Sequence, residues 1–267
     1  MDDFKEFIIP IAREAGIFLK ERLNDERVIA YKGEINIVTD ADRMSEEIII
    51  SKIYKKYPRH DILAEESTGT NKGSDFRWII DPLDGTTNYA HGYPVFCVSI
   101  ALEKEGEICL GAIYNPILNE MFVAERGKGA FLNDKRISVS NTIDLSRSLL
   151  ATGFPYDIRN DENNNINYFN GMARSAQAIR RAGSAALDMA YIAMGRFDGF
   201  WELKLMPWDT AAGWLLIVEA GGIVSDLFGN PYNLQSPHVL ASNGKIHIGM
   251  IDIFRKINKG DRSQIES

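Results

Sequence analysis

Cysteine and histidine are scarce in this chain of 267 residues. The two cysteines, Cys97 and Cys109, form no CxxC pair and no cluster with histidine, so neither a zinc site nor a disulfide framework is indicated. We expect both thiols to be reduced and buried. Of the 4 histidines only His91 lies near an acidic motif, and no Ser-His-Asp, Cys-His or phosphohistidine arrangement is recognisable. The sequence therefore does not support catalysis through a side-chain nucleophile.

Long apolar runs and an excess of basic residues are also missing. No apolar run approaches the roughly 18 residues that a membrane-spanning helix needs. Residues 1–24 begin with several charged side chains, unlike the basic start and unbroken apolar segment of a signal peptide. The formal net charge is −7, whereas a nucleic-acid partner usually requires a basic face. We therefore expect a cytoplasmic protein that binds neither membranes nor nucleic acid.

The chain has the composition of an ordinary globular protein. Apolar residues make up 45% and charged residues 25%, which suits a sizeable core. Short strands from residue 95 to residue 139 predict an antiparallel meander. We expect a seam near residues 140–145, which divides the chain into an N-terminal α+β part, 1–143, and a C-terminal α/β part, 144–267. Apolar periodicity predicts helices over 4–23, 39–57, 184–194, 207–220 and 245–257, and strands over 28–31, 62–65, 78–81, 95–102, 108–114, 121–125, 130–132, 137–139, 149–153, 197–202, 223–225 and 239–241.

The most informative segment covers residues 78–89. Its apolar start is typical of a buried strand, and it breaks at Asp81, where the following proline disfavours helical geometry. We therefore expect a turn to hold Asp81 and Asp84. Gly85 lets the backbone approach a ligand closely, and Thr86 supplies a hydroxyl and an amide at the start of a helix. Carboxylates beside donors of this kind predict a metal-assisted phosphate site.

Asp-Pro and Asp-Gly pairs also occur in purely structural turns, so this segment alone does not establish a site. Two further acids end or begin elements: Glu65 closes the apolar run 62–64, and Asp209 lies at a helix start. Together the three acidic positions favour a site. An anionic substrate in an acidic site needs cations, and carboxylates bind hard divalent ions, so the pattern indicates magnesium.

Three other positions have two interpretations each. Asp42 is either an acid in the first turn of a helix or an additional carboxylate near the metal site. The Gly183-Ser184 entrance to a helix either donates amides to an anion or is an ordinary N-cap. Glu202, at the end of a predicted strand, is either a substrate contact or a surface acid.

Two segments resemble the paired signatures of the inositol monophosphatase family: Trp78–Asn88, and Trp208–Gly213 with Glu219–Gly222. The resemblance extends over nearly the whole chain, includes Ala64–Ser67 and Arg181–Ala186, and is greatest to bacterial members. It implies an α+β fold, a layered αβαβα sandwich of the sugar/inositol phosphatase type. It also implies a homodimer that hydrolyses a small phosphorylated substrate with two or three Mg²⁺ ions and is sensitive to lithium.

The resemblance also implies roles for individual residues. In catalysis Glu65 and Thr86 would position the attacking water, with Asp42 hydrogen-bonded to Thr86. Met206 stands where animal relatives carry histidine, and Ala64 replaces a glycine, so we expect substrate contacts to differ in detail. The implied metal ligands are Glu65, Asp81, Asp84, Asp209 and the backbone carbonyl of Leu83. The implied substrate contacts are Asp84, Gly85, Thr86, Gly183, Ser184, Ala185, Glu202 and Asp209.

Within the family the resemblance implies an inositol-1-monophosphatase. Residues 84–88 resemble the inositol branch more than the nucleotide bisphosphatase branch, in which a charged residue would follow Asp-Gly-Thr. Fructose-1,6-bisphosphatase, histidinol-phosphatase and 3′,5′-bisphosphate nucleotidase activities remain alternatives on the same scaffold. A regulatory binding protein that retains the metal site is an alternative of a different class, because a fold alone does not determine function.

Overall fold

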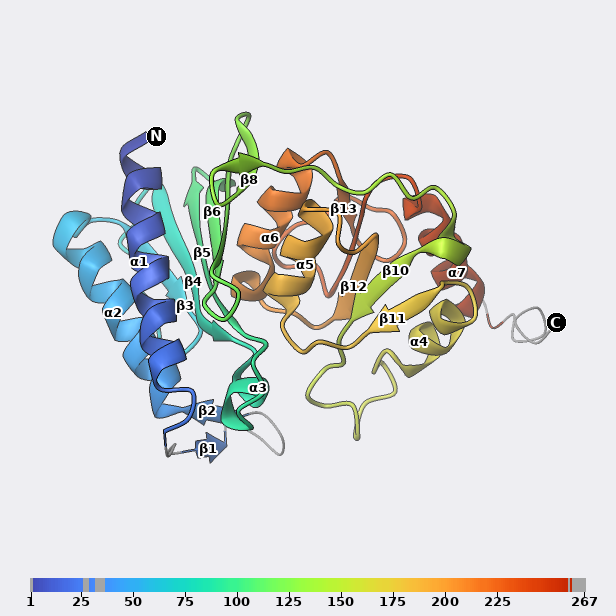
Figure 1. Cartoon of the computed structure of the whole chain (residues 1–267), viewed down its shortest axis with the longest axis horizontal. Helices are drawn as coiled ribbons and strands as arrows, with labels where there is room; N and C mark the ends of the chain where they lie inside the picture. Colours follow the sequence, from blue (N-terminus) through green and yellow to red (C-terminus); the bar gives the residue numbers. More distant parts are fainter. Residues whose placement is uncertain (1, 26–28, 32–36, 259, 261–267) are drawn as a thin grey trace.

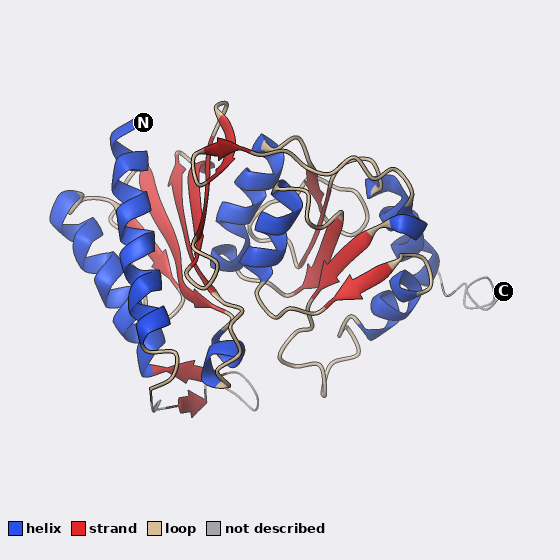
Figure 2. Ribbon diagram, viewed as in Figure 1, coloured by secondary structure: helices blue, strands red, loops and turns tan. Residues whose placement is uncertain are grey.

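The computed structural model describes residues 2–25, 29–31, 37–258 and 260. Helices and sheets alternate in layers, which confirms the predicted α+β sandwich of αβαβα type (Figure 1, Figure 2). One pair of helices covers the outer face of the larger sheet, a second pair lies between the sheets, and a third covers the smaller sheet. In that order the pairs are α1 (Asp2–Glu21) and α2 (Asp40–Lys56), α5 (Ala185–Ala193) and α6 (Pro207–Glu219), and α4 (Ile166–Ala173) and α7 (His247–Asn258).

The outer helix α1 shows how periodicity produces these layers. Ile8, Ile11, Ala15 and Leu19 recur at helical spacing, and all four are buried in the core beneath α1. Pro10 lies inside the helix and does not end it. The predicted helix is therefore present without interruption.

The larger sheet has seven strands in the order β3-β4-β5-β6-β7-β8-β9. Only β3 and β4 are parallel, and the remaining pairs form the predicted antiparallel meander. The predicted strand at 137–139 is wrong. The last strand instead begins directly after Asn133 and Asp134, whose positive φ angles suit a tight hairpin turn, and the chain then leaves the sheet. The strands are β3 (Asp61–Ala64), β4 (Phe76–Asp84), β5 (Cys97–Lys104), β6 (Glu107–Asn115), β7 (Glu120–Glu125), β8 (Gly129–Leu132) and β9 (Lys135–Arg136).

The smaller sheet has five strands in the order β11-β10-β12-β14-β13. Here β10 runs parallel to β11 and β12, and the other two pairs are antiparallel. The edge strand β11 is not among the predicted strands. The strands are β10 (Leu149–Thr152), β11 (Ala178–Arg180), β12 (Gly199–Leu203), β13 (Ile223–Ser225) and β14 (His238–Ser242). The remaining elements are β1 (Ile29–Tyr31), β2 (Ile37–Thr39), α3 (Thr86–Ala90) and the short 3₁₀ turn η1 (Leu145–Arg147).

Helices α5 and α6 lie between the two sheets, and their composition explains why. A helix that is covered on all sides must be apolar on all sides, and small residues let it approach a sheet closely. A Cβ atom added to Gly111 on β6 would lie only 2.9 Å from the Cα of Ala212 on α6. One hydrophobic cluster joins Phe122 of the larger sheet to Leu216 of α6 and Phe200 of the smaller sheet. The division at 143/144 into two parts stays a prediction.

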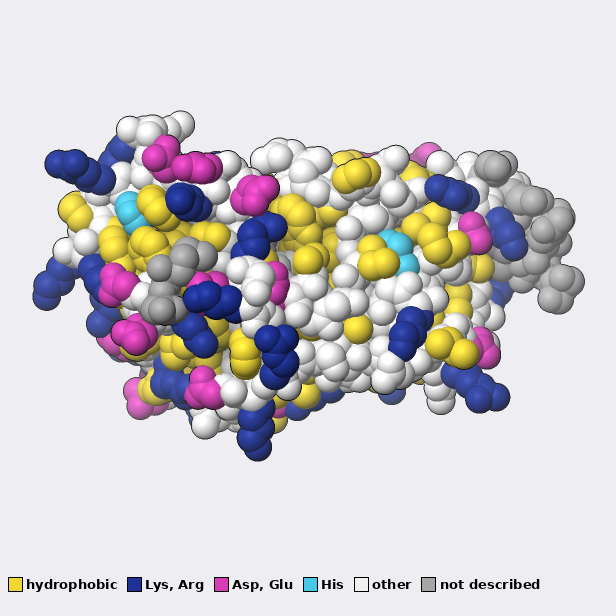
Figure 3. Space-filling model, turned by 90° about the horizontal axis from the view of Figure 1, so that it is seen from above, with side chains coloured by type: hydrophobic (Ala, Val, Ile, Leu, Met, Phe, Trp, Pro, Cys, Tyr) yellow, Lys and Arg dark blue, Asp and Glu magenta, His cyan; other side chains and the backbone are white. Residues whose placement is uncertain are grey.

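Cys97 and Cys109 are both free and buried, as predicted. On the face seen from above, basic and acidic side chains are interspersed, and hydrophobic side chains reach the surface in several places (Figure 3). Among the described residues, no helix combines the length and the apolar character needed to cross a membrane. The predicted first strand at 28–31 is present from Ile29 onward, and Val28 lies outside the described residues.

Candidate active site

The acidic segment lies at the end of β4, which is longer than predicted. The strand continues through Pro82 to Asp84 instead of ending at Asp81. Asp81 pairs with Ser99, and Asp84 pairs with Cys97. The two acids are three residues apart on β4, but their partners are only two residues apart on β5, so β4 contains a β-bulge with one extra residue. In a regular strand, residues three apart point to opposite faces, and the extra residue of this bulge turns both acids to the same side. Both carboxylates therefore line one cavity.

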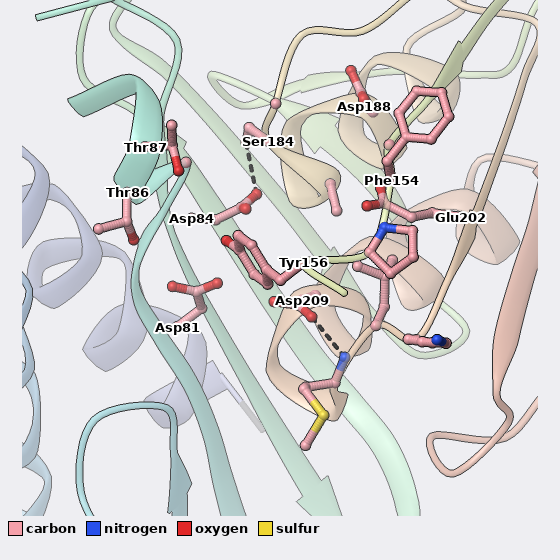
Figure 4. Close-up of a pocket in the computed structure, with 18 of the residues that line it drawn as sticks. Asp81, Asp84, Thr86, Thr87, Phe154, Tyr156, Ser184, Asp188, Glu202 and Asp209 are labelled. Atoms are coloured by element: carbon pink, nitrogen blue, oxygen red, sulfur yellow. Dashed lines mark hydrogen bonds between the residues drawn. The ribbon is translucent and has the colours of Figure 1, made fainter. Parts of the chain in front are cut away.

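This cavity has a volume of about 740 Å³. It is bounded by α3, the N-terminal ends of α5 and α6, the end of β12 and a loop at residues 153–158 (Figure 4). Asp42 contacts Thr86 but is not among the described residues that line the cavity. The other predicted site residues all line it: Glu65, Asp81, Leu83, Asp84, Gly85, Thr86, Gly183, Ser184, Ala185, Glu202 and Asp209.

Asp84 is held by the N-terminal end of α5. The Ser184 hydroxyl donates a hydrogen bond of 2.6 Å to Asp84 Oδ2, and the Ala186 amide donates a second of 2.7 Å to the same oxygen. Ser184 is also the N-cap of α5, where its hydroxyl accepts from the Leu187 amide. Burial raises the pKa of Asp84, and these hydrogen bonds oppose that rise. The Ser184 side chain thus positions Asp84, a function that its predicted role as a substrate contact does not include.

Asp209 and Asp81 are both held as acceptors of backbone hydrogen bonds. The Met206 amide donates to Asp209 Oδ2 at 2.6 Å, which places this acid in the first turn of α6, where the helix dipole favours negative charge. The Leu83 amide donates to Asp81 Oδ1 at 3.0 Å. Burial and the neighbouring carboxylates raise the pKa of Asp81 and of Asp209 well above the ordinary range. The cavity therefore brings together buried acidic groups that repel one another when they are ionised.

Asp42 links α2 to α3 through a chain of hydrogen bonds. Its Oδ2 accepts from the Thr39 amide at 2.8 Å and from the Thr39 hydroxyl at 2.6 Å. Its Oδ1 accepts from the Thr86 hydroxyl at 2.9 Å, so the predicted hydrogen bond between Asp42 and Thr86 is present. Burial raises the pKa of Asp42 although all three donors lower it. The acid in the first turn of α2 thus also orients a side chain of the cavity.

Gly85 lies where β4 passes into α3, and its backbone requires glycine. Its φ of 99° falls in the left-handed region, and an added Cβ would lie 2.8 Å from the Val95 carbonyl oxygen. Three residues further along, the Asn88 side chain donates to the carbonyls of Val95 and Ala182, both at 2.8 Å. This amide fixes α3 against the segment that leads into α5. Asn88 has no role among the sequence predictions.

Comparison with known proteins places this arrangement in a family. The model of the inositol monophosphatase family matches residues 1–259. The chain belongs to the inositol monophosphatase family. It is 45% identical over 230 residues to a protein of Mesorhizobium japonicum named inositol-1-monophosphatase, which covers 85% of this chain and 86% of the relative. It is 43% identical over 241 residues to the Nus factor SuhB of Pseudomonas aeruginosa, at 88% and 89% coverage. The crystal structure of the extragenic suppressor protein suhB from Bartonella henselae matches with a TM-score of 0.91 and 40% identity, over 95% of this chain and 99% of the other.

The donor set of the cavity fits the hard divalent metal expected in an inositol monophosphatase. All five implied ligand atoms are oxygens, from four carboxylates and one carbonyl, and oxygen ligands suit Mg²⁺. In the described part of the chain, no group of three or more His, Cys, Asp or Glu side chains already has the geometry to hold a metal ion. The metal ligands therefore stay a prediction, which rests on donor chemistry and shared location and not on ligand geometry.

Several residues that line this cavity were not among the site residues predicted from the sequence. Phe154 and Tyr156 reach it from the loop at 153–158 (Figure 4). Burial and the carboxylates that Tyr156 faces raise the pKa of its hydroxyl. Asp188, in the first turn of α5, was also missed. Phe154 and Tyr156 come from a loop that carries no motif, and Asp188 lies just beyond the segment Arg181–Ala186.

Proposed function

We propose that this member of the inositol monophosphatase family is a magnesium-dependent phosphate monoester hydrolase whose substrate is an inositol phosphate. The observation that carries the proposal is the convergence of Glu65, Asp81, Asp84 and Asp209 on one cavity beside Gly85. The name inositol-1-monophosphatase of the relative from Mesorhizobium japonicum supports the substrate class.

In this proposal the four carboxylates and the Leu83 carbonyl hold two or three Mg²⁺ ions. Bound magnesium would polarise the phosphoryl oxygens and lower the pKa of a water molecule. Mutual repulsion contributes to the raised pKa values of Asp81 and Asp209, and a cation between them would relieve it. The family is generally metal-dependent, which also supports a metal ion bound by these carboxylates.

Glu65 and Thr86 position the attacking water in the proposed mechanism. The Thr86 hydroxyl has one proton to donate, and two acceptors are in reach, Asp42 Oδ1 at 2.9 Å and the Leu83 carbonyl at 3.0 Å. Because both acceptors are protein oxygens, the lone pairs of Thr86 Oγ1 are free to accept a hydrogen bond from water on the cavity side. Asp42 therefore acts through Thr86 and needs no direct contact with substrate.

The remaining residues bind the two parts of the ester. The amides of Gly85 and Thr86 hold phosphate oxygens at the start of α3, where no Cβ on Gly85 blocks the approach. Gly183 and Ala185 line the wall beside the leaving alcohol, and Glu202 accepts a hydrogen bond from one of its hydroxyls. Ser184 contributes by holding Asp84.

The homodimer and the lithium sensitivity implied by the resemblance belong to the same proposal and rest on the family alone. Light scattering coupled to size-exclusion chromatography tests the dimer. Inhibition of phosphate release by lithium chloride, with sodium chloride as the matched control, tests the second trait.

A regulatory binding role is the second candidate, because the relative from Pseudomonas aeruginosa is named a Nus factor. The presence of all four predicted acidic metal ligands in the cavity supports an enzyme. A protein partner that still binds the Asp84→Asn variant would establish a role independent of catalysis, whereas loss of binding in that variant would tie the partner to the cavity.

A substrate panel tests the proposed function. Phosphate release is measured from inositol 1-phosphate, fructose 1,6-bisphosphate, histidinol phosphate and adenosine 3′,5′-bisphosphate, with magnesium and with a chelator. We expect release that requires magnesium and is fastest from inositol 1-phosphate. A different preferred ester would keep the chemistry and move the protein to another branch, and no release from any ester would reject the hydrolase.

A further inference from the structure

The loop that connects β10 to α4, residues 153–165, is fixed at its base by a buried asparagine. The Asn165 side chain donates to the Gly153 carbonyl at 2.6 Å, and its own oxygen accepts from the Trp201 indole at 2.6 Å. Asn165 has a φ of 77°, a left-handed conformation that asparagine tolerates better than most residues. One side chain thus joins both ends of the loop to β12.

The middle of the same loop is held by Lys204, which directly follows β12. Its Nζ atom donates to Asp157 Oδ2 at 2.7 Å and to Asp161 Oδ2 at 2.5 Å. The φ of Lys204 is 61°, a left-handed conformation that is unfavourable for a long side chain. Such strain persists only where the surrounding structure imposes it, and it is concentrated at functional sites. The loop is therefore a fixed part of the cavity wall.

Tyr156 lies in this loop, next to Asp157, and extends into the cavity. Figure 4 shows its ring between Asp84 and Asp209. The residue is 55% exposed, so packing in the core does not account for its position. Within the described part of the chain its hydroxyl forms no hydrogen bond. Burial of the hydroxyl and the four facing carboxylates raise its pKa, so it stays protonated at neutral pH and is available as a donor.

Several other donors that line the cavity are already bound to protein oxygens. The hydroxyls of Thr86 and Ser184 and the side-chain amide of Asn88 all donate to such oxygens. The ammonium group of Lys204 is bound to the two aspartates of the loop. In the proposed function, backbone amides at the start of α3 hold phosphate from one wall of the cavity. Tyr156 comes from a different wall, so its hydroxyl is available to a phosphate oxygen that those amides leave free.

We propose that the Tyr156 hydroxyl donates a hydrogen bond to a phosphate oxygen of the bound ester. Lys204 is then a positioning residue, which acts through the two aspartates of the loop. The inference rests on the proposed hydrolase function and adds to it a contact with the group that all phosphate monoesters share. Hydrogen bonds to a charged oxygen are stronger than those to a neutral one, so a phosphate oxygen is a better acceptor for this donor than an alcohol.

The first test removes only the hydroxyl. In Tyr156→Phe we expect kcat/KM to fall about 10- to 100-fold for both inositol 1-phosphate and p-nitrophenyl phosphate, and in the same proportion, because the two esters share the phosphate. No loss on either ester would overturn the contact, and a loss confined to inositol 1-phosphate would overturn it by placing the hydroxyl at the alcohol. Tyr93→Phe is the matched control, because Tyr93 is exposed to a similar degree, 52%, and does not line the cavity.

A double-mutant cycle tests the positioning role of Lys204. Lys204→Met breaks both ion pairs, and we expect kcat/KM to fall about 3- to 10-fold in the wild type but to change little in Tyr156→Phe. Lys204→Arg, which can keep the ion pairs, should restore most of the activity. The thermal midpoint of Lys204→Met should stay close to that of the wild type, because exposed ion pairs contribute little stability. Equal losses in the two backgrounds would show that Lys204 does not act through Tyr156.

The last test does not depend on turnover. Calorimetry measures the binding of inorganic phosphate in the presence of magnesium, and we expect a dissociation constant about 10-fold higher in Tyr156→Phe than in the wild type and Tyr93→Phe. Binding that is equal in Tyr156→Phe, or absent from the wild type, would overturn the contact. If phosphate binding depends on Tyr156 but no ester is hydrolysed, the contact stands and the hydrolase fails. If esters are hydrolysed equally by the wild type and Tyr156→Phe, the hydrolase stands and the contact fails.

Discussion

The hydrogen bond from Thr86 to Asp42 gives a prediction for a single hydroxyl. Thr86→Val keeps the shape of the side chain but removes the group that faces the water, so we expect kcat to fall about 100-fold or more. The unfolding free energy should fall by about 1–3 kcal/mol, because the buried Asp42 loses a donor. Thr68→Val, at an exposed position outside this cavity, is the matched control for both measurements. A Thr86→Val enzyme with unchanged kcat would contradict the proposed role.

His247 gives a prediction for pH dependence away from the cavity. It is buried with its two ring nitrogens hydrogen-bonded to Ser225 and Ser242, and burial lowers its pKa to about 4. A depressed pKa means that the neutral ring stabilises the fold above the unfolded pKa of about 6.5, and that this contribution is lost as the pH falls toward 4. The stability difference between the wild type and His247→Gln should therefore shrink between pH 7 and pH 5, by at most about 1.4 kcal/mol per unit. Urea denaturation of both proteins at the two pH values tests this, and a constant difference would show that the ring does not titrate on unfolding.

The close packing of α6 on β6 gives a prediction for the elements between the sheets. Gly111→Ala would place a Cβ 2.9 Å from the Cα of Ala212, so α6 must move. We expect a loss of about 1–3 kcal/mol in unfolding free energy from overpacking. Gly249→Ala on α7 is the control, because its Cβ would meet only Leu145 at 3.8 Å, and a helical alanine should stabilise slightly. Equal effects of the two substitutions in urea denaturation would show that this contact is not tight.

Most helices and strands could be predicted from the sequence, because burial of one face requires apolar residues at regular spacing. The helix predicted at 39–57 is observed at Asp40–Lys56, and the one predicted at 207–220 at Pro207–Glu219. The strand β11 was missed because its three residues are partly or fully exposed and give no apolar run. The segment 137–139 alternates apolar and polar residues but is not a strand, since the Val139 amide donates to the Ala220 carbonyl at the end of α6. Such tertiary contacts override a local pattern.

Some features of the candidate site could also be predicted from the sequence, and others could not. Acids that end strands or begin helices could be predicted, because several of them at such positions indicate a shared function. The bulge between Asp81 and Asp84 could not, because it depends on the pairing of β4 with β5. Asp188 was overlooked because an acid in the first turn of a helix is ordinary, and only the two enclosing sheets make it buried.

The assembled cavity gives a prediction for the stability of the protein as a unit. Carboxylates from separate segments repel one another in it, so a bound cation should stabilise the fold. At a magnesium concentration about 100-fold above the dissociation constant, the gain is about 2.7 kcal/mol. Asp81→Asn should raise the thermal midpoint of the metal-free protein, because it removes an acid whose pKa is raised by burial and by neighbouring carboxylates. The same substitution should reduce the increase caused by magnesium. Calorimetry with magnesium and with chelator tests both effects, and an unchanged magnesium effect in Asp81→Asn would remove this residue from the ligand set.

The most direct test of the account is the magnesium dependence of phosphate release from inositol 1-phosphate, measured side by side for the wild type and Asp209→Asn. Far-ultraviolet circular dichroism confirms that both proteins are folded. We predict turnover of the wild type that disappears with chelator and returns with magnesium, and a loss of about 100-fold or more in Asp209→Asn. Turnover that is indifferent to chelator, or that survives in Asp209→Asn, would contradict a magnesium hydrolase built on these carboxylates.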